Sequence, residues 1–370
     1  MIHVTSSAQQ GGGAWHIISL ASASTNSFYD TTIVVPKSQP LTQTLTSSAP
    51  LLQYFPFSLP DYFSLLFAVA CIAKCYKKVI VHSHGPAAAF VVKFIKLFFP
   101  RIAHVYTPHG VQFTFYSYWK NSLYKVYELI TRCFIDGIIY ISDHEARTFS
   151  DYGLLTNKDS VVIDNLVNPK KIALGGRVAR SPDAPLRLGM IARICRQKQS
   201  PLIFDLCSLL PSVHFVYVGQ RGDLESEFLK MLSCSCPTNL VYLPSVNDMA
   251  SFYASLDGIL MPSVHEGLPY VFLEAVCNHI PIFCSPIPPF TCIYDKYPSP
   301  LINIVMPSNN RAFPAAADFS GAINSFYKSC SDVRSLSGDP SSLQLISRYS
   351  DIVSWARSYD DAYHHFSACV

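Results

Sequence analysis

Residues 263–275 read SVHEGLPYVFLEA, and this stretch decides how the surrounding chain folds. The apolar run Gly258–Met261 before it predicts a buried strand, Gly267 supplies a turn, and Pro269 suits the first turn of a helix. A second apolar run follows the helical segment at Pro281–Cys284. A helix between two buried strands is typical of a parallel sheet, in which the chain returns through a crossover helix.

The same alternation of short apolar runs and longer helical patterns extends along the chain in both directions. It predicts an α/β fold built from parallel sheets. A chain of 370 residues, 49% of them hydrophobic, is too long for one ordinary core and suits two doubly wound, Rossmann-like domains. Besides a first strand near the N-terminus, the further predicted strands are Thr31–Val35, Val79–His84, Ala103–Thr107, Gly137–Ser142, Ser160–Ile163, Leu186–Ile191, His214–Val218 and Leu240–Leu243.

The polar, turn-forming segment Pro169–Pro185 separates the two sets of strands. We therefore expect a first domain at residues 1–170 and a second at residues 171–348. Residues 349–370 form an aromatic-rich helical pattern that we expect to pack back on the first domain. Two facing domains of this kind predict a ligand cleft between them, beyond the carboxyl ends of their strands.

The stretch 263–275 also carries the clearest candidate for ligand binding. A helix that begins near Gly267 and Leu268 would offer free backbone N–H groups and the positive end of its dipole, which together favour a phosphate. Glu266 and Glu274 lie at most ~12 Å apart along a helix axis. That separation suits an extended ligand, because one carboxylate can bind sugar hydroxyls while the other binds a ribose diol.

This pair of glutamates, followed by Ala275, resembles the signature of the retaining nucleotide-sugar glycosyltransferases of family 4, in the glycogen synthase and sucrose synthase-like superfamily. The resemblance implies the GT-B fold, in which two Rossmann-like domains face each other with the donor cleft between them. Other stretches agree in order over nearly the whole chain: Gly11–Gly13, Thr107–Gly110, Asp164–Val167, Gly189–Lys198 and Val218–Gly219.

The resemblance also implies a role for each matching residue. His109 stands where the family has its active-site histidine, and Glu266 is the other residue assigned to catalysis. Arg193 and Lys198 match the arginine and lysine that hold the donor diphosphate, where they offset the charge that grows on the leaving group. Glu274 would bind the donor's ribose. Backbone contacts to the diphosphate are expected from Gly12, Gly13, Gly267 and Leu268.

Two positions depart from the family pattern, because Gln199 and Leu166 stand where the family usually has glycine. These departures concern loop shape and leave the phosphate roles of Arg193 and Lys198 in place. A nicotinamide-dependent oxidoreductase would share the alternation of strands and helices, but Gly11–Gly13 lacks the glycine spacing of a dinucleotide loop. A sugar-nucleotide epimerase and a non-catalytic sugar-nucleotide-binding protein of the same fold remain alternatives.

Charge is unevenly distributed along the chain, although the net charge is only +3. So small an excess argues against a partner that is a nucleic acid. The stretch between Tyr62 and Ile135 is rich in aromatic residues and holds many cations, with Glu128 as its single acid. This pattern is typical of a surface on anionic lipid, or of a solvated helix face over an ordinary core. The cations are Lys74, Lys77, Lys78, Lys93, Lys96, Arg101, Lys120, Lys125 and Arg132.

Several absences bear on cofactor and location. No apolar run reaches the ~20 residues that span a bilayer, and residues 1–5 lack the pattern of a secretory signal. The 12 cysteines lack metal-ligand spacing and are expected to be reduced core residues. His82 and His84 are expected to be ordinary buried histidines of the core. No two aspartates are separated by a single residue, and such a pair is the usual metal clamp on a sugar nucleotide. We therefore predict a metal-independent enzyme without a cofactor. Its predicted location is cytoplasmic, on the inner face of the cytoplasmic membrane.

The function expected from these features is retaining transfer of a sugar from a nucleotide diphosphate donor, most simply a UDP-sugar. The expected acceptor is a lipid-linked saccharide of bacterial surface polysaccharide biosynthesis, such as O-antigen, capsule or exopolysaccharide. No convincing carboxylate nucleophile stands beside the proposed donor site. The expected mechanism is therefore front-face transfer, in which the leaving diphosphate helps to remove the proton of the acceptor hydroxyl.

Overall fold

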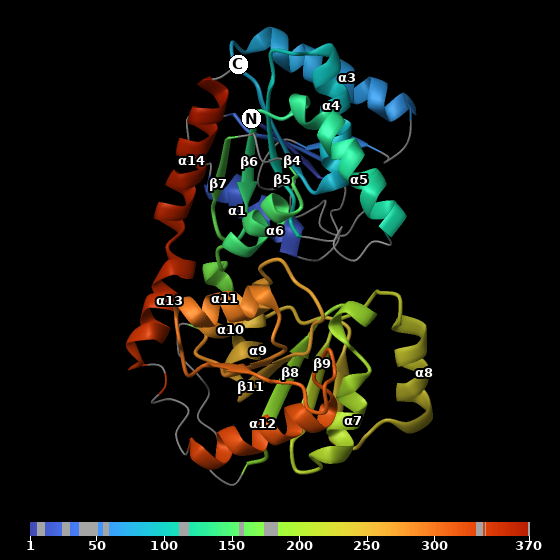
Figure 1. The fold of residues 1–370 in the computed structure, drawn as a ribbon, viewed down its shortest axis with the longest axis vertical. Coiled ribbons are helices and arrows are strands. Elements are labelled where there is room, and N and C mark those ends of the chain that lie inside the picture. Colours follow the sequence, from blue (N-terminus) through green and yellow to red (C-terminus); the bar gives the residue numbers. More distant parts are fainter. Residues whose placement is uncertain are drawn as a thin grey trace. The chain divides into compact units, whose positions relative to one another are not determined.

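The computed structural model forms two compact units, which are described separately (Figure 1). The first unit contains Met1–Leu166 and Asp351–Val370, and the second contains Val167–Ser350. The sequence-based boundaries, after residues 170 and 348, lie a few residues from these. Part of the predicted linker lies outside the described residues, which are 1–5, 12–23, 30–36, 51–54, 59–110, 118–154, 159–173, 184–330, 336 and 338–368.

The first unit is built on a parallel sheet with the strand order β3-β2-β1-β4-β5-β6-β7. Its central strands are buried along their whole length, as continuous apolar runs in parallel sheets usually are. The strands are β1 (Ile2–Thr5), β2 (Thr32–Pro36), β3 (Leu51–Tyr54), β4 (Ile80–His84), β5 (Ala103–Thr107), β6 (Gly137–Tyr140) and β7 (Asp159–Val162).

Helices connect these strands and cover the sheet of the first unit. Pro86 opens one of them at a position where a missing N–H costs nothing, after Gly85 has turned the chain at a φ of 84°. The helices are α1 (Gly12–Ala23), α3 (Leu59–Cys75), α4 (Pro86–Phe98), α5 (Tyr118–Thr131), α6 (Asp143–Asp151) and α14 (Ile352–Ala368), with a short 3₁₀ turn at Arg132–Phe134.

The C-terminal helix α14 belongs to the core of the first unit. Four of its aromatic side chains lie in a buried cluster with residues of β4, β5 and β6. The indole N–H of Trp355 donates to the carbonyl of Asp164 at 2.9 Å. Asp351 accepts hydrogen bonds from the backbone N–H groups of Val353 and Ser354, so a new helix begins there and Tyr349 stays in the second unit.

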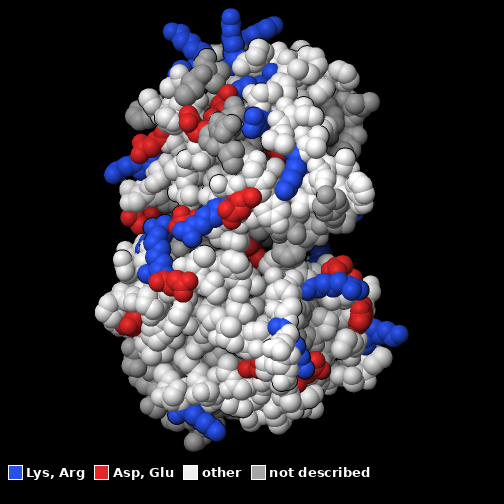
Figure 2. Space-filling model, viewed as in Figure 1, with Lys and Arg blue, Asp and Glu red and all other residues white. Residues whose placement is uncertain are grey.

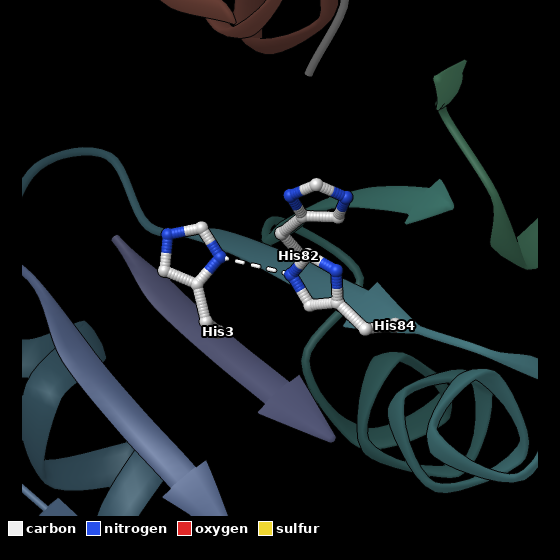
Figure 3. Close-up of side chains that lie close together, drawn as sticks. All are labelled: His3, His82 and His84. Atoms are coloured by element: carbon white, nitrogen blue, oxygen red, sulfur yellow. Dashed lines mark hydrogen bonds between the residues drawn. The ribbon is translucent and has the colours of Figure 1, made fainter. Parts of the chain in front are cut away.

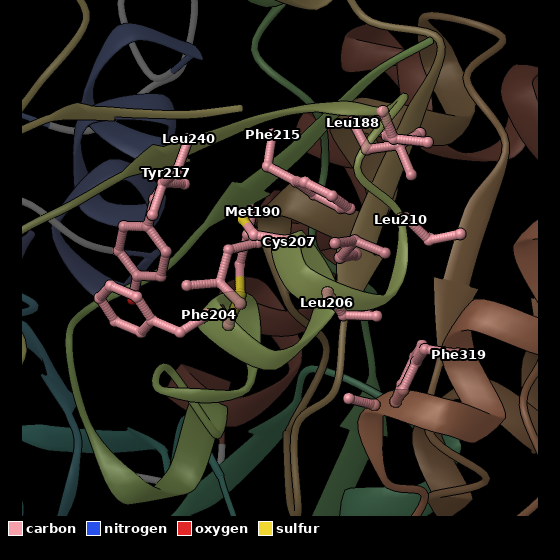
Figure 4. Close-up of a cluster of buried hydrophobic side chains, with 14 of the residues drawn as sticks. Leu188, Met190, Phe204, Leu206, Cys207, Leu210, Phe215, Tyr217, Leu240 and Phe319 are labelled. Atoms are coloured by element: carbon pink, nitrogen blue, oxygen red, sulfur yellow. The ribbon is translucent and has the colours of Figure 1, made fainter. Parts of the chain in front are cut away.

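The second unit has a parallel sheet of its own, with the order β10-β9-β8-β11-β12-β13. Aromatic and aliphatic side chains from sequence positions between Leu188 and Ile323 form one buried cluster on a face of that sheet (Figure 4). The strands are β8 (Arg187–Ile191), β9 (His214–Val218), β10 (Leu240–Leu243), β11 (Gly258–Met261), β12 (Ile282–Cys284) and β13 (Ile302–Ile304). The helices are α7 (Leu202–Leu209), α8 (Glu225–Ser235), α9 (Met249–Ala254), α10 (Tyr270–Cys277), α11 (Pro288–Lys296), α12 (Ala316–Ser329) and α13 (Pro340–Ser350), with 3₁₀ turns at Pro169–Lys171 and Arg196–Lys198.

Some details differ from the sequence-based expectations. Strands β3 and β13 were not predicted. Pro269 lies one residue before helix α10, in an extended conformation with a ψ of 132°. The expectation that the cysteines are core residues is wrong for Cys71, Cys75, Cys133, Cys234 and Cys236, which are exposed.

Helices α4 and α5 correct the interpretation of the basic stretch. Lys93 is buried and donates to Glu128 at 3.0 Å, and Lys96 is buried beside Asp136. These two cations therefore neutralise acids inside the unit and cannot face a membrane. Among the described helices, none combines the length and the apolar composition that crossing a bilayer requires.

Two glycines allow loops of the second unit to pack backbone against backbone. Gly219, after β9, has a φ of 147°, and a Cβ there would lie 1.8 Å from the carbonyl oxygen of Ala192. A Cβ on Gly222 would lie 2.1 Å from the carbonyl oxygen of Ile194. The loop after β9 can therefore support the loop after β8 only because side chains are missing at these positions.

We expect Gly219→Ala to lower the free energy of unfolding of the second unit by at least about 2 kcal/mol, because both the backbone conformation and the contact forbid a Cβ. Thermal unfolding followed by circular dichroism measures the loss. Gly321→Ala is the control: Gly321 lies in α12, and no described atom beyond its own helix backbone lies within 4 Å of an added Cβ, so alanine should be neutral or stabilise by about 0.5–1 kcal/mol. Equal effects of the two substitutions would contradict this account.

Candidate active site

An ion pair between Lys198 and Glu266 forms the centre of the predicted donor site in the second unit. Lys198 lies in the 3₁₀ turn after β8, and Glu266 lies in the loop between β11 and α10. The Ser263 hydroxyl donates to the same carboxylate at 2.6 Å. Both charged side chains are largely buried, so each holds the other in place.

Hydrogen bonds join the two loops that carry this ion pair. The N–H of Val264 donates to the carbonyl of Gln197 at 2.9 Å, and the Gln197 amide donates to the carbonyl of His265 at 2.9 Å. Gln199 has a φ of 49°, the left-handed conformation for which glycine is best suited. Its side-chain amide donates to the carbonyl of Pro262 at 2.6 Å. The loop therefore adopts the turn without glycine, and a side-chain contact fixes it.

Arg193 differs from Lys198, because its side chain is exposed. One guanidinium nitrogen lies 3.4 Å from the Gln197 amide oxygen. Gly267 and Leu268 lie between Glu266 and the start of α10, as the sequence predicts. The structure thus brings together the predicted residues Arg193, Lys198, Glu266, Gly267 and Leu268 on adjacent loops.

Glu274 lies within α10 and is almost fully buried. Lys171 donates to one of its carboxylate oxygens at 2.6 Å, and the Tyr253 hydroxyl donates to the other at 2.6 Å. The Asn278 side chain joins Lys171 to the same helix, since it donates to the carbonyls of Lys171 and Glu274 at 3.0 and 2.7 Å. Sequence reasoning missed Lys171 and Tyr253, which lie far from Glu274 along the chain.

In the first unit, His109 lies in the loop after β5 with a φ of 59°, followed by Gly110 with a φ of 134°. The buried carboxylate of Glu145 accepts hydrogen bonds from the N–H groups of Gly110 and of Ile141, the latter at 2.9 Å. Glu145 thus ties the loop of His109 to the start of α6. Sequence analysis gave no signal for this residue, although Ser142 at the helix cap marks where α6 begins.

Gly12 and Gly13 form the start of α1, and Gly11 lies outside the described residues. A Cβ on Gly13 would have no described atom within 4 Å, so packing does not require glycine there. One turn later, the ring of His16 lies 4.8 Å from that of His109, centroid to centroid. His16 contacts the amide oxygen of Asn165 at 3.1 Å and the Tyr359 hydroxyl at 3.0 Å.

Two groups of histidines have nitrogen atoms close enough to hold a metal ion, His3 with His82 and His84 (Figure 3), and His16 with His84 and His109. Burial lowers the pKa of His3 to about 3 and holds the pKa of His84 well below its ordinary value, so the rings are neutral. Most of their nitrogens are engaged in hydrogen bonds, and those of His82 lie 2.8 Å from the hydroxyls of Tyr363 and Thr107. Metal independence stays a prediction.

Both halves of the chain match known protein families. The model for Glycosyltransferase Family 4 matches residues 10–171, and the model for glycosyl transferases group 1 matches residues 177–297. An O-antigen biosynthesis glycosyltransferase of Escherichia coli, WclY, is 24% identical over 132 residues, which cover 34% of this chain and 37% of the relative. The match therefore spans little more than a third of that relative's length.

Solved structures share the fold over almost the whole chain. HepE of Anabaena in complex with UDP and glucose has a TM-score of 0.76 and 15% identity, covering 98% of this chain and 99% of the other. Sucrose-phosphate synthase of Thermosynechococcus elongatus has a TM-score of 0.78 and 12% identity, covering 100% and 99%. These likenesses confirm the predicted fold of two Rossmann-like domains.

Glu145 predicts a pH dependence of stability in the first unit. Burial raises the pKa of its carboxyl to about 7 from an ordinary 4.5, so the folded unit binds a proton that the unfolded chain has released. The stability that this group contributes is present below about pH 4.5 and is lost as the pH rises to about 7. Relative to Glu145→Gln, the wild type should therefore become less stable across this window.

Urea unfolding followed by tryptophan fluorescence measures this difference, because all 3 tryptophans, Trp15, Trp119 and Trp355, belong to the first unit. The comparison with Glu145→Gln removes the titration of all other groups. A difference that grows in favour of the wild type between pH 4.5 and 7 would contradict the raised pKa.

Proposed function

Since the chain belongs to the glycosyltransferases with the GT-B fold, we propose that it transfers a sugar from a nucleotide diphosphate donor, a UDP-sugar, to a lipid-linked saccharide. The observation that carries this proposal is the cluster of Arg193, Lys198 and Glu266 on loops that hydrogen bonds join. The likeness to an O-antigen biosynthesis glycosyltransferase supports a role in polysaccharide assembly. We place the reaction in bacterial surface polysaccharide biosynthesis.

The charges of the donor site suit a diphosphate. Lys198 is held by Glu266, so it supplies a fixed positive charge, while the exposed guanidinium of Arg193 offers a planar fork for phosphate oxygens. Charge that develops on the leaving diphosphate is stabilised by donors that are already in place, which typically contributes a few kcal/mol per donor. Gly267 and Leu268 would contribute backbone N–H groups at the start of α10.

Glu274 suits the ribose of the donor. An ionised carboxylate has about four sites that accept hydrogen bonds, and Lys171 and Tyr253 occupy two of them. The remaining sites can accept the two neighbouring hydroxyls of a ribose. Lys171 also places a positive charge beside the buried carboxylate and holds it in one orientation.

We further propose that transfer retains the anomeric configuration by front-face attack. The carboxylate nearest the proposed diphosphate site, Glu266, is paired with Lys198 and accepts from Ser263, which suits it to orient a sugar rather than attack it. The leaving diphosphate itself then takes the proton of the acceptor hydroxyl. An inverted anomeric product would contradict this mechanism.

Nucleotide binding tests the donor site. With a metal chelator present, UDP should stabilise the wild type by about 2.7 kcal/mol at a hundredfold excess over its Kd, and GDP or ADP should stabilise it less. Arg193→Gln removes one charge-assisted contact and should weaken UDP binding at least about tenfold. Glu274→Gln should weaken it by a similar factor. Thermal unfolding at several nucleotide concentrations gives each Kd.

Arg196→Gln is the matched control, because Arg196 lies on the same turn, is 81% exposed and pairs only loosely with Asp223 at 3.6 Å. It should bind UDP like the wild type. Equal losses in Arg196→Gln and Arg193→Gln would point to general charge attraction. No stabilisation by any nucleotide would remove the basis of the proposed donor site.

An apolar surface on the first unit supports attachment to a membrane. Side chains on one face of α5 are strongly exposed, with Leu123 at 71% and Ile130 at 69%. Adjacent α4 exposes further aromatic and aliphatic residues, and Figure 2 shows Lys and Arg side chains projecting from the end of the unit around α3. Apolar side chains beside cations suit the interface of an anionic bilayer, where a lipid-linked acceptor would lie. We define this membrane-facing surface by Phe90, Phe94, Leu97, Phe98, Trp119, Leu123, Val126, Leu129 and Ile130.

We expect the protein to bind vesicles that contain phosphatidylglycerol at low salt, and to bind vesicles of phosphatidylcholine alone more weakly. Replacing Leu123 and Ile130 together by aspartate should weaken binding at least tenfold, since about 1.5–3 kcal/mol of burial is lost per side chain. Vesicle flotation measures the bound fraction. Val353→Asp is the control, because Val353 is 66% exposed on α14 of the same unit. Failure of the wild type to float would exclude the membrane assignment.

A further inference from the structure

Three imidazoles of the first unit form a continuous hydrogen-bonded chain that ends at His109. Nδ1 of His3, in β1, lies 3.1 Å from Nε2 of His84, at the end of β4. Nδ1 of His84 lies 3.0 Å from Nε2 of His109. Figure 3 shows the first of these contacts, between rings that project from neighbouring parallel strands.

Each ring in this chain carries a single proton. His3 and His84 are buried, and desolvation holds the pKa of all three imidazoles well below the ordinary value. A neutral imidazole donates through one nitrogen and accepts through the other. All the N–H groups of the chain must therefore point in the same direction, either from His3 toward His109 or the reverse.

The His3 end of this row of hydrogen-bonded imidazoles decides in which direction the N–H groups point. Nε2 of His3 is buried and has no hydrogen-bond partner among the described residues. If the N–H groups pointed from His109 toward His3, this atom would carry a buried N–H without an acceptor, which native proteins avoid more strictly than an unpaired acceptor. The opposite direction leaves only a lone pair unused at that place.

We propose that His84 is a positioning residue that, together with His3, fixes His109 in the tautomer with its proton on Nδ1. Nε2 of His109 then accepts from Nδ1–H of His84. Nδ1–H of His109 is left to donate, and among the described residues the structure gives it no acceptor. The inference concerns the tautomer of His109 within the first unit and does not depend on which acceptor completes this bond.

The neighbouring histidines do not belong to this chain. His16 donates from Nδ1 to the amide oxygen of Asn165 and accepts at Nε2 from the Tyr359 hydroxyl, so its tautomer is fixed independently. His82 lies 4.0 Å from His84, centroid to centroid, but its nitrogens contact two hydroxyl groups. His109 as a general base would need a free lone pair, and the proposed direction leaves it none.

Nuclear magnetic resonance of the full chain, labelled with ¹⁵N at histidine, tests the proposal directly. Long-range ¹H–¹⁵N spectra distinguish the two tautomers of each ring, and we expect protons on Nδ1 of His3, His84 and His109. In His84→Phe the constraint is gone, so His109 should move toward the Nε2–H tautomer that a neutral histidine side chain favours in water. His84→Asn places an amide N–H close to the lost Nδ1–H and should restore the wild-type tautomer.

His104→Phe is the matched control, because His104 is equally buried and contacts Ser83 and Phe134 outside the chain. It should leave the tautomer of His109 unchanged. Protons on Nε2 in the wild type, or a His109 tautomer that His84→Phe does not change, would overturn the proposal. The spectra need no ligand, so this result is independent of whether UDP binds.

Discussion

All the strands that the structure describes run parallel within their sheets, and this constraint places every candidate site. Parallel strands end at one edge of a sheet, so the loops that follow them gather there. The strand order reverses between β1 and β4 in one unit and between β8 and β11 in the other. His84 ends β4, and Lys198 and Glu266 follow β8 and β11. Residues distant in sequence thus meet because their strands are neighbours.

The same constraint explains what the sequence could predict. Buried parallel strands are continuous apolar runs, so the bounds of β4, β5, β8, β9 and β11 could be predicted closely from these runs alone. The resemblance to the glycosyltransferase family then singled out Arg193, Lys198, Glu266 and His109 in the loops after these strands. Strands β3 and β13 were missed, although strands of the same length such as β10 and β12 were predicted.

What the sequence could not predict are the side chains that come from elsewhere to complete each site. Glu145 and Lys171 are polar residues in ordinary surroundings along the chain, and only tertiary folding brings them to Gly110 and Glu274. Lys93 and Lys96 gave the opposite error. They matched a basic surface in sequence, but burial beside Glu128 and Asp136 makes them internal ion pairs.

The candidate sites of the two units are built from different kinds of buried polar group, although the first unit also buries the ion pairs of Lys93 and Lys96 elsewhere. The first unit buries neutral imidazoles, whose cost is small as long as each nitrogen finds a partner. The second unit buries opposite charges, Lys198 with Glu266 and Lys171 with Glu274. Desolvation makes such pairs poor sources of stability. Their value is geometric, because a carboxylate held by a fixed lysine keeps spare lone pairs that can accept from hydroxyls. Under the proposed function, Glu274 would bind a ribose diol while the exposed Arg193 would bind phosphate.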